Sequence, residues 1–183
     1  MPNRRTPFLG GEFYHLYNRG VDRGAVFISD DNYRYFMRLL IEKAELHAIG
    51  IVTFCLMPSH FHFLVRPTFN AAVGRFINGL LGSYVQGLNA SRQRVGPLFQ
   101  GRFKSVHVDR DEYLAHLARY IHLNPVAAGL VSRPGDWPDS NYANVSEDGV
   151  LIGGVFPDAA AYQRFVEGPD AFELPASLKL AGS

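Results

Sequence analysis

Two histidines stand one residue apart in the stretch Ser59 to Pro67, SHFHFLVRP, which follows an apolar run. Side chains alternate between the two faces of a β-strand, so we expect His60 and His62 on one face and Phe61 and Phe63 on the other. Imidazole binds divalent transition metals well, and two such ligands leave positions for substrate oxygens. The pair therefore predicts either a metal site or two ordinary polar residues on a wet sheet face.

A second pair has helical spacing. Tyr120 and Asn124 are four residues apart and share one face of a helix. The amide oxygen of Asn124 could complete a coordination sphere, and a tyrosine phenol can form a covalent phosphoester. A metal would assist by withdrawing charge from the phosphate oxygens. The alternative is that Tyr120 is a packed helix residue. His116, one turn earlier, is either a helper of Tyr120 or an ordinary exposed or satisfied histidine.

These residues need a scaffold, and hydrophobic periodicity predicts seven elements. The expected strands are Phe13–Asn18, Ile51–Met57, His60–Pro67 and Arg102–Val108. The first expected helix begins at the capping residues Ser29–Asn32 and stops at Gly50. The second runs from Asn70 to Ala90, and the third runs from Glu112 to Asn124, where Pro125 should end it.

The resulting order is β-α-β-β-α-β-α. Its first six elements match the split β-α-β pattern of ferredoxin-like folds, so we expect an α+β protein with an antiparallel sheet, two helices on one face and an extra C-terminal helix. We expect one domain over residues 1–145. The acidic tail over residues 146–183 should be either a small capping element or partly disordered.

The net charge of +1 conceals two opposite regions. Residues 1–133 carry 16 Lys and Arg against 9 Asp and Glu, whereas residues 134–183 carry 2 against 8. No acidic residue lies between Glu45 and Asp109. This pattern indicates either a polyanionic partner or merely a basic solvated face.

Composition narrows the class of protein. No apolar run approaches the roughly 20 residues that span a bilayer, and the N-terminus has no apolar core typical of a secretory signal. Cys55 is the only cysteine, which excludes an intrachain disulfide and fits a reducing cytosol. We therefore expect a cytoplasmic protein without a membrane segment.

Longer motifs resemble a known family. HFHFLVRP is similar to the histidine–hydrophobe–histidine motif of HUH endonucleases, and YIHLNPVAAGLV resembles the nucleophile motif of single-tyrosine HUH transposases. The stretches FYHLYNRGVDRG, CLMPSHFHFLV and GPLFQGRFKSVHVDRDEYLAHLARYIHLNPVAAGLV resemble, in this order, motifs of the REP-associated tyrosine transposases. The similarity runs from about Phe13 to Tyr142, where WPDSNY resembles the segment after the nucleophile helix.

The resemblance implies a mechanism. His60 and His62, with Asn124 as third ligand, would bind Mg²⁺ or Mn²⁺, and Tyr120 would attack single-stranded DNA to give a 5′-phosphotyrosine and a free 3′-hydroxyl. The implied partner is DNA with palindromic, hairpin-forming repeats, and the implied location is the nucleoid of a prokaryote. The side chains suited to phosphate contacts are Arg19, Arg23, Arg66, Arg102 and Lys104. Phe99, Phe103 and Tyr84 are either base-stacking platforms or core residues.

Two departures and several alternatives remain. The family often has a basic C-terminal segment where this chain is acidic, and Asn124 stands where related transposases use a glutamine. The competing interpretation is a catalytically silent module that binds DNA or RNA hairpins. The sequence leaves open a monomer or a homodimer, and a tyrosine acting in its own or its partner's site.

Overall fold

The computed structural model describes residues 7–109, 111–145 and 154–169. Four strands form one sheet in the order β2-β3-β1-β4, and every neighbouring pair is antiparallel. The strands are β1 (Phe13–Arg19), β2 (Ile49–Met57), β3 (His60–Pro67) and β4 (Lys104–Val108). The helices are α1 (Asp30–Leu46), α2 (Ala72–Ser91), α3 (Asp111–Ala127) and α4 (Ala159–Glu167), with short 3-10 turns at Val21–Arg23, Pro134–Asp136 and Tyr142–Asn144. The expected α+β fold of ferredoxin-like order is confirmed.

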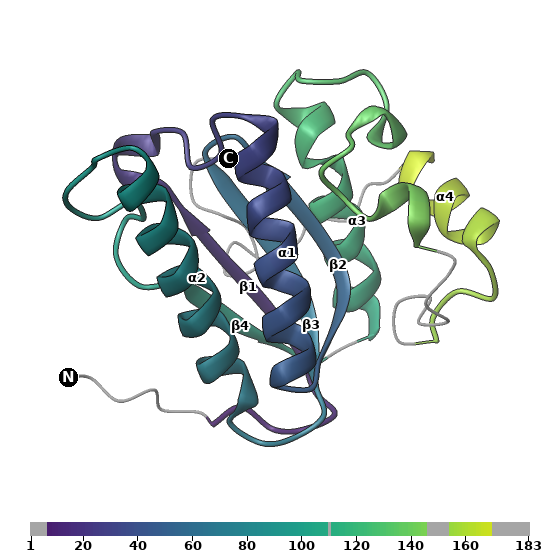
Figure 1. Ribbon diagram of the computed structural model, residues 1–183. Helices are drawn as coiled ribbons and strands as arrows, with labels where there is room; N and C mark the ends of the chain where they lie inside the picture. The colour runs from purple at the N-terminus through teal and green to yellow at the C-terminus, as the bar shows by residue number, and fades with distance from the viewer. Residues whose placement is uncertain (1–6, 110, 146–153, 170–183) are drawn as a thin grey trace.

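The sheet separates two apolar layers. Helices α1 and α2 lie side by side over one face, while α3, followed by α4, lies on the other side (Figure 1). Alternate residues of β3 enter the two layers, because Phe61 and Phe63 contact Phe36 of α1, whereas Leu64 belongs to the buried cluster that includes Leu117 of α3. A two-residue turn, Pro58-Ser59, joins β2 to β3, and Met57 faces His60 across it, which places the histidines at the start of a central strand.

Two predicted helix ends are wrong. Pro125 does not stop α3, which continues to Ala127, because a proline in the last turn removes only one backbone hydrogen bond. The chain leaves the helix at Gly129, whose φ is +68° and whose N–H donates to the carbonyl of Val126 at 2.9 Å. Gly50 does not stop α1 either. It lies within β2, and Ala48 takes the left-handed conformation with φ of +51°.

The chain after α3 covers the outer edge of β2. Leu56 N–H donates to the carbonyl of Asp139 at 2.8 Å, and the Trp137 indole donates to the carbonyl of Leu56 at 3.0 Å. The Asn141 side chain accepts from Phe54 N–H at 2.9 Å and donates to the carbonyl of Val52 at 3.0 Å. An exposed strand edge would offer unpaired backbone groups, so this segment completes the sheet.

Part of the predicted acidic tail is a helix that packs on α3. Tyr162 and Val166 of α4 are fully buried in the layer below α3. The Arg119 guanidinium donates to the carbonyl groups of Phe165, at 3.2 Å, and Gly168, at 2.7 Å, at the C-terminal end of α4. Residues 146–153 and 170–183 lie outside the described residues, and the domain boundary at residue 145 stays a prediction.

A buried histidine ties these parts together. His122 of α3 is fully buried between the Tyr162 hydroxyl, 2.6 Å from its Nδ1, and the Asn141 Oδ1, 2.9 Å from its Nε2. Burial lowers the pKa of His122 to about 4, although the hydrogen bond that its Nε2 donates to Asn141 Oδ1 opposes the shift. The imidazole is therefore neutral in the folded protein at neutral pH.

We predict that this histidine makes the fold sensitive to acid. Its folded pKa of about 4 lies below the ordinary value near 6.5, so its contribution to stability is complete above about pH 6.5 and is lost as the pH falls toward 4. In His122→Gln, the difference in unfolding free energy between about pH 7 and pH 4.5 should shrink by about 2–3 kcal/mol. Urea unfolding at both pH values measures it, and an equal pH dependence in the two proteins would contradict the prediction.

Candidate active site

The two histidines of the SHFHF stretch share the α3 face of the sheet. His62 is fully buried, His60 is partly buried, and their ring centroids lie 5.2 Å apart with the planes nearly perpendicular. Phe61 and Phe63 are fully buried on the opposite face. His62 is thus covered by the protein and does not lie on a wet sheet surface.

Hydrogen bonds hold one nitrogen of each ring. His62 Nδ1 lies 2.9 Å from His15 Nε2, and His60 Nδ1 lies 3.1 Å from the Ser59 hydroxyl. The Nε2 atoms of both His60 and His62 are buried, and within the described residues neither has a hydrogen-bond partner. Buried polar atoms are normally satisfied, so these two neighbouring nitrogens remain available to another group.

His15 is the residue that the sequence reasoning missed. It lies on β1, is fully buried and stacks on His62 with ring centroids 5.2 Å apart. Strand alternation alone places His15, Tyr17 and Arg19 on one face of β1. The missing information was the register of β1 against β3. That register pairs Tyr17 with His62 and so brings His15, two residues before Tyr17 on the same face, against the His62 ring.

The surroundings favour neutral imidazoles. Burial, followed by the neighbouring His15 and His60, holds the pKa of His62 well below its ordinary value. Burial also lowers the pKa of His60, and Arg19 adds to that lowering, while the side chain of Asn124 opposes it. Asn124 is therefore a neighbour of His60, although no hydrogen bond of good geometry reaches His60 Nε2 within the described residues. Neutral rings keep lone pairs for an electrophile.

Helix α3 brings Tyr120 and Asn124 to the histidines of the same chain. The Tyr120 ring lies edge-on to the His62 ring, with centroids 5.5 Å apart. Asn124 is buried, and its amide nitrogen donates to the carbonyl of Tyr120 at 2.7 Å, so its Oδ1 is the atom left for another partner. The four residues that the sequence singled out for chemistry thus meet in one place.

The remaining predicted site residues are spread out. The His116 ring contacts Phe165 of α4, with centroids 5.1 Å apart. Arg66 lies at the other end of β3 from His60, over the Phe13 ring and bonded through its Nε to the Gly11 carbonyl at 2.8 Å. The other four basic residues belong to the end of the sheet where β1 stops, β3 begins and β4 begins: Arg19, Arg23, Arg102 and Lys104.

The aromatic candidates for base stacking belong to the core. Tyr84 is fully buried, with its hydroxyl donating to the carbonyl of Val26 at 2.8 Å, and Phe99 is buried against Phe61. Phe103 is half-buried against the same layer. Stacking by Tyr84 or Phe99 is therefore excluded in this conformation, and the alternative reading as core residues is confirmed.

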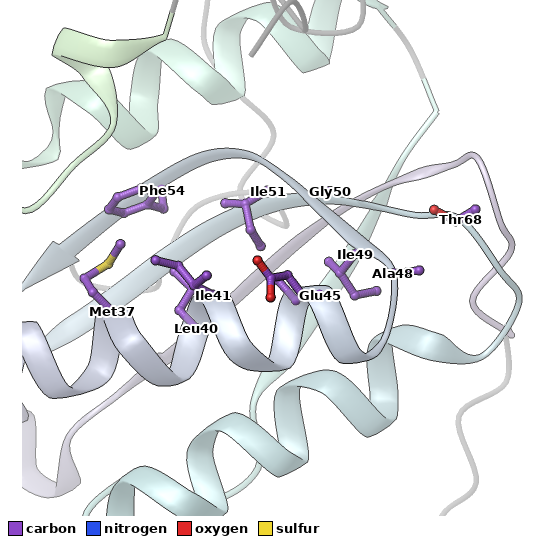
Figure 2. A pocket seen from close by; sticks show the side chains of 11 residues that line it. Met37, Leu40, Ile41, Glu45, Ala48, Ile49, Gly50, Ile51, Phe54 and Thr68 are labelled. Atoms are coloured by element: carbon purple, nitrogen blue, oxygen red, sulfur yellow. The ribbon is translucent and has the colours of Figure 1, made fainter. Parts of the chain in front are cut away.

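An apolar groove elsewhere does not suit this chemistry. It has a volume of about 430 Å³ and lies between α1 and β2, where Met37, Ile41 and Glu45 of α1 line one wall and Ile51 and Phe54 of β2 line the other (Figure 2). Its lining offers no basic side chain. Within the described part of the chain, no group of three or more His, Cys, Asp or Glu side chains is placed to hold a metal ion, and no helix is long and apolar enough to cross a membrane.

Comparisons with known proteins agree with this geometry. A sequence model described as transposase IS200-like matches residues 12–124, from β1 to Asn124 of α3. The chain belongs to the IS200-like transposase family. No curated protein matches the chain significantly.

Among solved structures, the chain is similar to a REP-associated tyrosine transposase bound to a REP hairpin, with a TM-score of 0.71, 17% sequence identity and 96% of each chain covered. At this identity the likeness concerns the fold. A crystal structure of a protein from Deinococcus radiodurans R1, provisionally assigned as a transposase, matches with a TM-score of 0.46 and 20% identity, over 66% of this chain and 95% of that chain.

Proposed function

We propose that the protein is a metal-dependent single-strand DNA endonuclease and strand transferase that acts beside hairpin-forming repeats. The observation that carries this proposal is the contact of the Tyr120 ring with the His62 ring, on the face of the sheet where the Nε2 atoms of His60 and His62 are buried and unsatisfied. Membership of a transposase family supports the reaction class. A purely structural histidine pair would be expected to have its buried nitrogens paired.

The donor set fits a divalent cation. His60, His62 and Asn124 would hold Mg²⁺ or Mn²⁺ through two imidazole nitrogens and one amide oxygen. The Nδ1 atoms of both histidines are engaged by Ser59 and His15, which is the arrangement that orients ligating histidines in proteins. When bound, the ion would withdraw charge from the oxygens of the phosphodiester and orient them.

Tyr120 would carry the covalent step. Its phenolic oxygen attacks the phosphorus and loses its proton, and the bond from phosphorus to the 3′-oxygen breaks. The DNA leaves with a free 3′-hydroxyl, and its 5′-phosphate stays on the tyrosine. Attack by a 3′-hydroxyl reverses the step and rejoins strands, so the energy of the phosphodiester bond is retained and no nucleotide cofactor is required.

A single chain would suffice for cleavage. The Tyr120 ring contacts His62 of its own chain, and α3, which carries Tyr120, shares a buried apolar cluster with the sheet. A second chain would not need to supply the tyrosine.

Hairpin-forming single-stranded DNA is the proposed substrate. The structure with a TM-score of 0.71 to this chain is bound to a REP hairpin. Arg19 lies directly opposite His60 in the sheet, and Lys104 begins the neighbouring strand, so positive charge borders the proposed metal ligands. Basic side chains at such positions bind the phosphate backbone and should make affinity fall with salt.

We predict a metal-dependent covalent adduct. The wild-type protein should attach to a labelled single-stranded hairpin taken from repeats beside its gene, with Mg²⁺ or Mn²⁺ and not with EDTA, as seen on a denaturing gel. Tyr120→Phe should give no adduct because the attacking oxygen is gone. His62→Ala should reduce the rate by more than the roughly 10–100-fold that changes around a metal site cost.

Matched controls exist on other surfaces. Tyr35→Phe, on α1, removes a hydroxyl bonded to the Ser83 carbonyl, and His107→Ala, on β4, removes a partly exposed imidazole. Both should form the adduct at the wild-type rate. Tight hairpin binding with no adduct under any metal would contradict the proposal and favour the silent binding module.

We also predict that His15 supports the metal ligand His62. His15→Ala should weaken Mn²⁺ binding, measured by calorimetry without DNA, by about 10–100-fold, because the His62 ring loses the bond that orients it. His15→Gln, whose amide can renew that bond, should recover part of the affinity. Equal Mn²⁺ affinity in folded wild type and His15→Ala would contradict this role.

A further inference from the structure

A small polar pocket lies beside the histidine pair. Its volume is about 140 Å³, and its walls come from the end of β1 and from the segment that leads into β4. The lining residues are Tyr17, Asn18, Arg19, Gln100 and Lys104. Of these, the sequence predicts DNA contacts only for Arg19 and Lys104, and no motif singles out Gln100.

Backbone hydrogen bonds fix the wall that carries Gln100. The N–H of Gln100 donates to the carbonyl of Arg19 at 2.8 Å, and the N–H of Val21 donates to the carbonyl of Leu98 at 3.0 Å. The Asn18 amide donates to the Gly101 carbonyl at 3.3 Å, and its Oδ1 accepts from the Arg19 N–H at 2.9 Å. Asn18 is thereby occupied in holding the wall of the pocket.

The side chains of the pocket are hydrogen-bond donors. Arg19 Nε donates to Gln100 Oε1 at 2.8 Å, so the amide group that Gln100 can offer a ligand is its NH₂. Arg19 and Lys104 add two positive charges, and the Tyr17 hydroxyl adds a further donor. A lining of donors and positive charges, without a carboxylate, suits an anion.

The pocket shares the face of the sheet with the candidate active site. Arg19 lies opposite His60, and Tyr17 lies opposite both His62 on β3 and Lys104 on β4. Residues directly opposite each other in antiparallel strands have Cα atoms about 4.5–5.5 Å apart. An anion held by Arg19 and Gln100 would therefore lie one strand away from the histidine that begins β3.

We propose that this pocket binds one phosphate group of the DNA strand, a neighbour of the phosphodiester that Tyr120 attacks, and so sets which bond is cut. The proposal rests on the proposed function. A phosphate fits better than a base, because the cavity is small and two positively charged side chains, Arg19 and Lys104, line it. Contacts to phosphates fix the register of a nucleic acid on a protein without reading its sequence.

The test replaces single phosphates with uncharged methylphosphonates. Hairpin oligonucleotides with a single-stranded flank, taken from repeats beside the gene, carry one methylphosphonate at each flank position in turn. Affinities are measured in EDTA for the wild type and for Gln100→Glu, which keeps the side-chain shape but places a carboxylate in the pocket. Gln86→Glu, an exposed residue of α2 on the opposite side of the sheet, makes the same charge change and is the control.

We expect one methylphosphonate position to weaken wild-type binding about tenfold, as befits a lost charge-assisted bond. Gln100→Glu should bind unmodified DNA about tenfold more weakly and show no further loss at that position, whereas Gln86→Glu should behave as wild type. Equal affinity of Gln100→Glu and wild type would overturn the proposal, as would an unchanged methylphosphonate profile in Gln100→Glu. These affinities are measured without metal and without cleavage. A failure of the adduct assay would therefore contradict the proposed function without changing the outcome of this binding test.

Discussion

Strand β3 places phenylalanine on one face of the sheet and histidine on the other, and both layers of the molecule depend on this alternation. Phe61 and Phe63 anchor the layer beneath α1 and α2, so the strand is fixed by the main core. His60 and His62 are consequently held rigidly on the face that α3 covers. A shift of one residue in register would bury the imidazoles in the core and remove the site.

The periodic segments of the sequence were sufficient to predict the fold and most of the site. β-branched and aromatic runs predicted the strands, and the period of two predicted that His60 and His62 share a face. Helical spacing placed Tyr120 and Asn124 on one side of α3, and the structure brings both to the histidines. These predictions succeeded because each depends on one element and its local geometry.

The features that were missed depend on contacts between distant segments. His15 approaches His62 only through the register of β1 against β3, and Gln100 reaches Arg19 only because its segment pairs with the end of β1. The end of α3 was missed for a different, local reason, because a proline in the last turn removes only one backbone hydrogen bond and the helix continues to Ala127. Local propensity is a weak guide where tertiary packing decides.

The central claim is that Tyr120, beside the histidines of its own chain, takes the 5′-phosphate of the cut strand. The most direct test is mass spectrometry of the nuclease-trimmed, proteolysed adduct formed with Mn²⁺. The account predicts a nucleotide on the peptide that contains Tyr120, at that residue. A nucleotide on Tyr17, whose ring also lies near His62, would contradict the claim, as would the absence of any modified tyrosine.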